Sequence, residues 1–340
     1  MKIKMADVAR YLGISKATVS LAVNGKPGVN EETRQKIFQC IEDMKKNHGK
    51  LPETPVQQKE KLMQMIKVVI VNHRKQVVCD PELDLWSEVL SVFEREVRKR
   101  GYLYGLTYLN ETEGDWPEVI RDCNMNFIAG IILFGTELSS VDHKAIRQIQ
   151  KPVVIYDYEI PDGSYSSVCI NNARAVEMAV DVLEKAGASS IYYFQTGKEI
   201  YNFVKRREAF LNQRLKQGVF STKEDMVSLG NSIGEITEQA FSYFSTHSLP
   251  EGAVFENYQV SIGVLTALRQ MGLLTSRKMK MVGIDEVPDY IVPDIELTQI
   301  RIPHAERALM AISLLDKEIT LFWKTKIRIF AEPELLNAKI

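Results

Sequence analysis

The sequence predicts a small all-α head joined to an α/β core that consists of two doubly wound parallel-sheet lobes. Three short amphipathic stretches, separated by turns that contain glycine, occupy the first 48 residues. From residue 66 onward, short apolar runs alternate with longer amphipathic stretches, a pattern typical of parallel sheets covered by helices. We therefore expect three regions: a helical domain at 1–48, a linker or hinge at 49–65 and a two-lobed domain at 66–340.

The head is expected to contain three helices. The first is indicated by apolar residues at the spacing of one helix face, which are Met5, Val8, Ala9 and Leu12. Gly13 ends it, and Ser15 is a suitable N-cap for a second helix that runs to about Asn24, because its hydroxyl can accept a free backbone N–H. Asn30 can cap a third helix, whose apolar face is formed by Ile37, Cys40, Ile41 and Met44.

The segment 49–65 is polar, contains two prolines and lacks a strong apolar period, so we interpret it as a linker. A loop within one domain is the alternative. The core that follows is predicted to contain strands at 66–71, 102–108, 127–134, 153–156, 190–195, 226–229, 253–256 and 279–284. Helices are predicted at 85–100, 115–123, 140–150, 173–186, 200–217, 233–246, 261–271 and 305–321. These strand–helix units are too many for one compact open sheet. The pattern therefore favours two lobes with a cleft at the carboxyl ends of their strands.

Composition excludes several classes of protein. Apolar residues make up 45% and charged residues 26% of the chain, as in ordinary globular proteins. Its cysteines, Cys40, Cys79, Cys123 and Cys169, form no CxxC or Cys/His cluster, so neither a metal site nor a disulfide framework is indicated, and we expect reduced thiols in the cytoplasm. No signal peptide and no apolar run of about 18 residues is found, so no membrane association is expected. No cofactor is implied.

Charge is unevenly distributed along the chain. Residues 1–50 contain ten Lys and Arg against five Asp and Glu, a net charge of +5, whereas the whole chain has −1. A basic head on an acidic body is expected of a nucleic-acid-binding domain. Helix, glycine turn and second short helix also form a helix-turn-helix plan, whose second helix enters the major groove. A three-helix bundle that contacts proteins has the same spacing and remains an alternative.

Side chains near the start of the second helix would contact base edges: Lys16 can donate to guanine acceptors and Ala17 can touch a thymine methyl. Ser20 and Leu21 follow on the same helix. Short polar or cationic groups suited to phosphates include Thr18, Asn24, Thr33 and Arg34. With the two capping residues, the candidate DNA-contacting set is Ser15, Lys16, Ala17, Thr18, Ser20, Leu21, Asn24, Asn30, Thr33 and Arg34.

The run ADVARYLGISKATVSLAVNGKPGVNEETRQKI closely resembles the head of the lactose-repressor/galactose-repressor family of transcriptional regulators. The resemblance implies a homodimer that binds an inverted-repeat operator in double-stranded DNA. Two departures matter. Leu21 stands where the family usually has a guanine-contacting Arg, so the operator sequence is expected to differ, and Lys4 stands where a Thr normally caps the first helix. No clear match to the family's hinge helix occurs in 49–65, where Leu62 is the best candidate for the leucine inserted in the minor groove, so we expect this helix to be weak or differently placed.

The resemblance extends more loosely through the core, in RKRGY, FIAGIILF, PVVIYDY, VGIDEVP and IELTQIRIP. It implies lobes like those of a periplasmic sugar-binding protein, with a small effector, most readily a carbohydrate, bound between them. Three polar positions match family ligand contacts: Arg206 in RREAF, Asn257, and Asp285 in VGIDE. A carboxylate, a guanidinium and an amide together suit a polyhydroxylated ligand. However, Tyr258 replaces the Asp of the family's ND pair.

Further candidate ligand residues are Trp86, at the second aromatic position of the family's NPFF motif, and the neighbours Asp157 and Tyr158. Leu85 stands at the first position, so the motif is lost. Structural interpretations compete at several of these positions: core packing for Trp86, strand-end turns for Asp157 and Asp285, and a surface location for Arg206. A further alternative is that the pocket no longer binds small molecules.

We therefore predict an allosteric, sequence-specific transcriptional regulator, a repressor by resemblance, whose operator affinity changes when an effector closes the lobes. The first alternative is a regulator of the same fold controlled by a protein partner, or one with no small-molecule effector. An enzyme is disfavoured because no GxGxxG follows the first strand, GxxxxGK[ST] does not occur, and the five histidines show no partner spacing. A free-standing solute-binding protein is also disfavoured, because it would need an export signal and would not carry a basic head.

Overall fold

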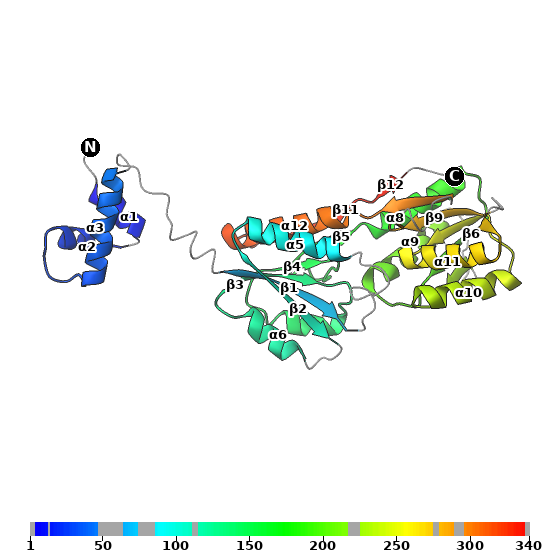
Figure 1. Cartoon of the computed structure of the whole chain (residues 1–340), viewed down its shortest axis with the longest axis horizontal. Coiled ribbons are helices and arrows are strands. Elements are labelled where there is room, and N and C mark those ends of the chain that lie inside the picture. The colour runs from blue at the N-terminus through cyan, green and yellow to red at the C-terminus, as the bar shows by residue number, and fades with distance from the viewer. Residues whose placement is uncertain are drawn as a thin grey trace. The chain divides into compact units, whose positions relative to one another are not determined.

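The computed structural model describes residues 4–12, 14–46, 64–73, 86–110, 115–216, 225–274, 279–288 and 296–336. The chain divides into two compact units, Met1–Met63 and Gln64–Ile340 (Figure 1). Most of the predicted linker at 49–65, including Leu62 and the hinge-helix expectation, lies outside the described residues.

The first unit contains the three expected helices, α1 (Met5–Leu12), α2 (Lys16–Val23) and α3 (Glu31–Lys46). Their apolar faces meet in a small core formed by Val8, Ala9, Val19, Ala22, Ile37, Cys40 and Met44. The predicted caps are present: Ser15 Oγ accepts the backbone N–H of Thr18 at 3.0 Å, and Asn30 Oδ1 accepts that of Thr33 at 2.8 Å. Local hydrogen bonding therefore determines where α2 and α3 begin.

The second unit contains two six-stranded sheets. The first lobe's sheet has the order β11-β5-β4-β3-β1-β2 and is entirely parallel. Its strands are β1 (Met65–Asn72), β2 (Leu103–Asn110), β3 (Ile128–Phe134), β4 (Val153–Tyr156), β5 (Ser166–Ile170) and β11 (Arg328–Ala331). One face is covered by α5 (Trp86–Lys99) and α12 (His304–Thr320), and the other by α6 (Trp116–Cys123), the 3₁₀ turn η2 (Ser140–Asp142) and the short α7 (His143–Ile146).

The second lobe's sheet has the order β12-β10-β9-β8-β6-β7, parallel except where β12 runs antiparallel to β10. Its strands are β6 (Ile191–Gln195), β7 (Met226–Ser228), β8 (Gly252–Phe255), β9 (Lys280–Ile284), β10 (Leu297–Arg301) and β12 (Glu334–Leu336). The helices α8 (Asn172–Lys185) and α9 (Tyr201–Lys216) cover one face, and α10 (Ile233–Thr246) and α11 (Tyr258–Gln270) the other.

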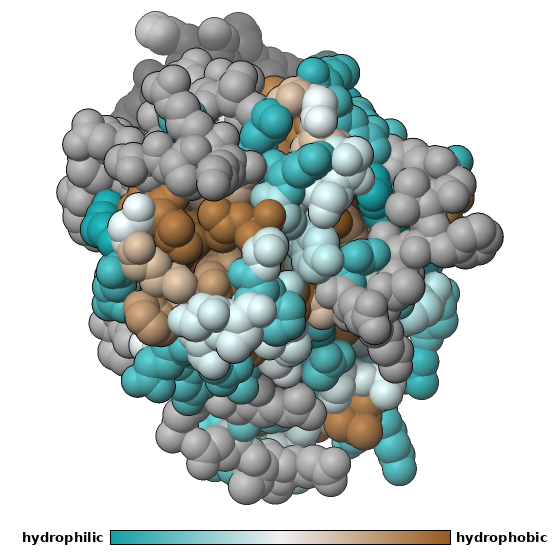
Figure 2. Space-filling view, turned by 90° about the vertical axis from the view of Figure 1, so that its right-hand side faces the viewer, coloured by the Kyte–Doolittle hydropathy of each residue, from teal (hydrophilic) through white to brown (hydrophobic). Residues whose placement is uncertain are grey.

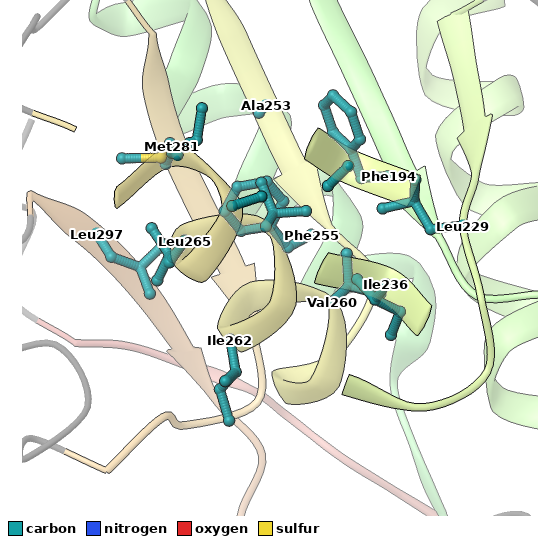
Figure 3. Packing of buried hydrophobic residues seen from close by; sticks show 14 of the residues in the cluster. Phe194, Leu229, Ile236, Ala253, Phe255, Val260, Ile262, Leu265, Met281 and Leu297 are labelled. Atoms are coloured by element: carbon teal, nitrogen blue, oxygen red, sulfur yellow. The ribbon is translucent and has the colours of Figure 1, made fainter. Parts of the chain in front are cut away.

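Both faces of each sheet are buried, which explains the near-continuous apolar strands of the sequence. On the second lobe, Phe255 lies beside α11 (Figure 3), whereas Phe194, on the neighbouring strand, packs against Tyr243 and Phe244 of α10. The outer end of this lobe is mostly hydrophilic, with apolar residues gathered in one area (Figure 2). Among its described residues, the exposed large apolar side chains are Leu215, Phe241 and Leu335.

The predicted fold class is confirmed, with two kinds of difference. Four strands were not predicted, β5, β10, β11 and β12, and three chain segments cross between the lobes, after β5, β10 and β11. The predicted helix at 140–150 is wrong, because only η2 and the four-residue α7 form there. Asp142 is buried and accepts hydrogen bonds from Ser139 N and Trp116 Nε1, which ties this segment to α6 instead of letting a long helix propagate.

Candidate functional site

The second helix of the head presents its amino-terminal turn to solvent. Lys16 and Ala17 are exposed, whereas Val19 and Ala22 on the opposite face are fully buried against the other helices. The two exposed side chains therefore lie where a helix-turn-helix protein contacts base edges. Leu21 is half-buried, and its Cδ1 atom lies 3.9 Å from the position that a Cβ atom on Gly28 would occupy.

Several predicted phosphate-contacting groups are already engaged within the head. The Thr18 hydroxyl lies 2.8 Å from Ser15 Oγ, and Asn24 Nδ2 donates to Ser20 Oγ at 3.3 Å. Arg34 donates from Nη1 to the carbonyl of Ala22 and from Nη2 to that of Lys26, both at 2.9 Å. Arg34 therefore satisfies carbonyls at the end of α2 and in the turn that follows, a structural role that the sequence did not indicate.

A cavity opens between the carboxyl ends of the strands of the two lobes. Five of the six predicted ligand residues line it, which are Trp86, Asp157, Arg206, Asn257 and Asp285. The others that line it are Thr136, Ile170, Ile200, Asn202, Phe203, Tyr258, Gln259 and His304. This is the position at which open parallel sheets bind ligands.

The second lobe contributes a buried ion pair. Arg206, on α9, is 2% exposed and donates from Nη1 to Asp285 Oδ2 at 3.0 Å. Its Nε donates to Asn172 Oδ1 at 3.0 Å and its Nη1 to the carbonyl of Glu256 at 2.6 Å. Burial by itself would raise the pKa of Asp285, but the Arg206 guanidinium and His304 outweigh it and hold that pKa well below its usual range. Asp285 is therefore a fixed carboxylate in the cavity wall.

The first lobe contributes a second pair of the same kind. Asp157 follows β4, is 1% exposed, and accepts from Arg307 Nη2 of α12 and from Thr136 Oγ1, the latter at 2.7 Å. The guanidinium carbon of Arg307 also lies 4.5 Å from the ring centroid of Tyr156. Asp157 and Asp285 both have a left-handed backbone, with φ of 71° and 70°, directly after a central strand. Each lobe thus supplies one arginine-bound carboxylate at the same place in its sheet.

His304 connects the two pairs. It is the first residue of α12, just after the chain crosses from β10 in the second lobe to the first lobe. Its Nδ1 lies 3.3 Å from Arg307 Nη1, and its Nε2 lies 3.6 Å from Asp285 Oδ1. The ring also meets Trp86 edge to face, with centroids 5.3 Å apart. One side chain at a lobe crossing therefore contacts both lobes.

Asn257 and Tyr158 differ from the roles that the sequence suggested. Asn257 lines the cavity, but its Oδ1 caps α11 by accepting the backbone N–H of Val260 at 3.0 Å. Tyr158 does not line the cavity. Its hydroxyl lies 3.0 Å from His143 Nε2, and its ring packs in the core on the α6 and α7 side of the sheet. The left-handed backbone at Asp157 breaks the strand alternation, so Asp157 bonds to Arg307 on the α12 side while Tyr158 packs on the opposite side of the sheet.

Sequence reasoning missed Thr136, Asn202 and His304. Thr136 follows β3 at a strand end, which is the one local signal that would have found it. Asn202 Oδ1 accepts from Asn172 Nδ2 at 2.8 Å and belongs to the polar group around Arg206. His304 lies in IELTQIRIPH, directly after a run matched to the family, but no spacing in the sequence brings it to Asp285.

Comparison with known proteins agrees with this description. Residues 4–45 match the model for bacterial regulatory proteins of the lacI family, and residues 180–337 match that for a periplasmic binding protein-like domain. The chain is 26% identical over 316 residues to the HTH-type transcriptional regulator GalS of Salmonella typhimurium, covering 92% of this chain and 88% of that protein.

Solved structures share the fold at lower identity. The transcriptional regulator CelR–cellobiose complex aligns with a TM-score of 0.68 at 16% identity, over 99% of both chains. A LacI family transcriptional regulator from Enterococcus faecium with bound ribose aligns with a TM-score of 0.66 at 16% identity, over 81% of this chain and 97% of that one.

The head, the two-lobed core and these relatives define a DNA-binding transcriptional regulator. Its head is a domain of the lacI family of bacterial regulatory proteins, and its core contains a periplasmic binding protein-like domain. No helix among the described residues is long and apolar enough to cross a membrane.

Proposed function

We propose that this regulator binds an inverted-repeat operator as a homodimer in the cytoplasm, and that a small carbohydrate in the cavity between the lobes changes its operator affinity. The domain limits 1–48, 49–65 and 66–340 are part of this proposal. The observation that supports it most directly is the cavity, where two fixed carboxylates face apolar and aromatic side chains.

Sequence-specific contacts are assigned to the exposed start of α2. Lys16 and Ala17 would contact base edges, with Ser20 and Leu21 beside them. Ser15 and Asn30 would act by capping their helices, and the backbone N–H groups that remain free there suit phosphates. Thr18, Asn24, Thr33 and Arg34 would support this surface, since the bonds of Thr18, Asn24 and Arg34 within the head hold it in shape.

A carbohydrate fits the chemistry of the cavity. Its hydroxyls would donate to Asp157 and Asp285, and its C–H face would pack on Trp86 or Phe203. The structural relatives with bound cellobiose and ribose share this fold. We infer binding without turnover, because the cavity residues that bear reactive groups bond to structural partners.

Ligand binding would act on DNA through the lobe crossings. Three chain segments connect the lobes, and one of them carries His304. A ligand that bridges Asp157 and Asp285 would change the angle between the lobes about these segments. The change in operator affinity equals the change in ligand affinity that the operator causes, whatever its sign.

The test uses fluorescence anisotropy with an imperfect palindrome from the DNA upstream of the gene. Lys16→Gln should abolish the preference for this DNA over a scrambled sequence, whereas Lys45→Gln, at an exposed position of α3, should keep it. Adding a panel of sugars should change the operator affinity for at least one of them. Preference for the palindrome that survives Lys16→Gln would refute the assignment of α2.

A second candidate, control by a protein partner without a small effector, is favoured by one observation. The charged groups of the cavity already bond to one another, as Arg206 does to Asp285 and Arg307 does to Asp157. If calorimetry finds no sugar or nucleoside that binds at millimolar concentration, this second candidate replaces the first.

A further inference from the structure

Among the residues that the structure describes, the arginines at the cavity and behind its wall are each paired with an aspartate that lines it. Arg206 is paired with Asp285 in one lobe, and Arg307 is paired with Asp157 behind the cavity wall of the other. All four residues are almost completely buried: the most exposed side chain, that of Asp285, is 12% exposed. Neither guanidinium is therefore an unneutralised cation that could receive an anionic ligand.

His304 contacts both pairs through its two ring nitrogens. A guanidinium has only donors, so His304 Nδ1 must be the acceptor of the contact with Arg307 Nη1 at 3.3 Å. The ring proton then lies on Nε2, which faces Asp285 Oδ1 at 3.6 Å. The neutral Nε2–H form thus satisfies both neighbours, whereas a second proton on Nδ1 would face the Arg307 guanidinium.

Arg207 does not supply the missing cation, although it is adjacent to Arg206. Its Nε donates to the buried Glu256 Oε1 at 2.8 Å, and its Nη1 donates to Glu199 at 2.6 Å. Its Nη2 donates to the carbonyls of Thr196 and Lys198. This guanidinium holds the loop before α9 and is not among the groups that line the cavity.

The remaining hydrogen-bonding capacity is that of a site for hydroxyl groups. The carboxylates of Asp157 and Asp285 keep lone pairs that accept, and the amide nitrogens of Asn202 and Asn257 donate to none of the described residues. Ile170, Ile200 and Phe203 supply apolar walls between these polar groups. A hydroxyl both donates and accepts, whereas a phosphate or carboxylate would meet, among the described residues that line the cavity, two aspartates and one guanidinium that is already paired.

We propose that the effector carries no net charge, and that the internal pairing of Arg206 and Arg307 excludes sugar phosphates and sugar acids. This inference rests on the proposed carbohydrate effector and specifies its class. Asp157 is the residue that controls the selectivity, because it lines the cavity and neutralises Arg307, which lies behind the first-lobe side of the wall.

The test is calorimetry on the full-length protein with matched sets of probes: D-glucose, D-glucose 6-phosphate and D-glucuronate, then D-ribose and D-ribose 5-phosphate, then cellobiose and cellobionate. The wild type should bind a neutral member at least about 100-fold more tightly than its charged counterparts, since a buried unpaired charge is costly. Tighter binding of a phosphate or acid than of its neutral counterpart would overturn the inference but leave a carbohydrate effector intact.

Two variants test whether the pairing of the arginines causes the preference for a neutral ligand. Asp157→Asn frees the charge of Arg307, and His304→Lys adds a cation at a side chain that is 28% exposed and so tolerates a change better than the buried aspartate. Either should reduce the preference for the neutral probe by about tenfold or more. Asp162→Asn, which makes the same charge change in an exposed ion pair with Arg147, should leave it unchanged. Thermal unfolding of each variant checks that it is folded.

The outcomes separate the two proposals. Unchanged selectivity in folded Asp157→Asn and His304→Lys proteins would refute the role of charge pairing. If no probe, neutral or charged, binds the wild type, the carbohydrate effector is refuted and this inference falls with it.

Discussion

Replacing Arg206 by methionine should destabilise the second lobe strongly. The change keeps much of the buried volume but removes the donors to Asn172, to the carbonyl of Glu256 and to Asp285, at 3.0, 2.6 and 3.0 Å. It leaves Asp285 buried without its cation. Breaking one side of a buried ion pair costs about 3–5 kcal/mol, and we expect a loss in this range.

Adding Asp285→Asn to this variant should recover part of the loss. The orphaned charge is then gone, while the side chain keeps its shape, so the double variant should be more stable than Arg206→Met alone by about 2 kcal/mol. Urea unfolding, followed by tryptophan fluorescence, measures both values. Arg174→Met, which breaks an exposed pair with Glu177, is the control and should change stability by less than about 0.5 kcal/mol.

The pH dependence gives an independent check. In the wild type the pKa of Asp285 lies below its unfolded value of about 3.9, so its contribution is complete above that pH and is lost only as the pH falls toward the folded pKa. Without Arg206, burial prevails and raises this pKa. The loss in free energy of unfolding caused by Arg206→Met should therefore be smaller at pH 5 than at pH 7.5. A deficit below about 1 kcal/mol, or one that does not change with pH, would refute this account of the pair.

Four further outcomes are expected. Ser15→Ala should destabilise the head by about 1 kcal/mol through loss of the N-cap, whereas Ser15→Asp should not, as thermal unfolding would show. Arg34→Leu should cost the head about 2 kcal/mol yet leave the salt dependence of operator binding unchanged; a phosphate contact would instead lower the slope of log affinity against log salt by about 1. Leu21→Arg should add a preference for guanine of about 1–3 kcal/mol in competition between operators with single base changes. Burial raises the pKa of Cys123 to about 11 and that of Cys169 to about 12, so neither should react with iodoacetamide at pH 8 until urea is added, as mass spectrometry would detect.

The head could be predicted closely because its signals are local. Ser15 and Asn30 each accept the backbone N–H of the residue three positions ahead, and the apolar spacing of α3 places Ile37 and Met44 in the core. What could not be predicted is the use of Arg34. Its partners are the carbonyls of Ala22 and Lys26, and backbone acceptors leave no trace in a residue pattern.

In the lobes, the long apolar strands were predicted within two residues at each end, and the missed strands contain polar residues or lie at sheet edges. β5 begins with two buried serines, and Ser166 Oγ reaches Glu318 of α12 at 2.5 Å. A buried polar strand is stable only when such a distant partner exists, so the pattern SSVCI does not itself indicate a strand. β11 and β12 are short and mostly exposed, which weakens their apolar period.

In the cavity, too, contacts between residues far apart in the sequence could not be predicted. Arg206, Asn257 and Asp285 could be placed by resemblance because each lies in a run that matches the family. Asp157 could also be placed, but not its cation, because Arg307 is 150 residues further along the chain and reaches the first lobe only after the last crossing but one. Sequence reasoning therefore treated Arg206 and the two aspartates as open ligand contacts.

The pairing of these groups changes what the site can select. A free arginine next to free carboxylates would accept charged and uncharged sugars alike, whereas two closed pairs leave hydroxyl-matching acceptors and amide donors. Because Asp157 and Asp285 hold equivalent left-handed positions in the two sheets, each lobe closes its own pair, and His304 at the crossing meets both. Selectivity and lobe movement would thus depend on the same few contacts, so a variant that alters the charge preference should also alter the operator response to the ligand.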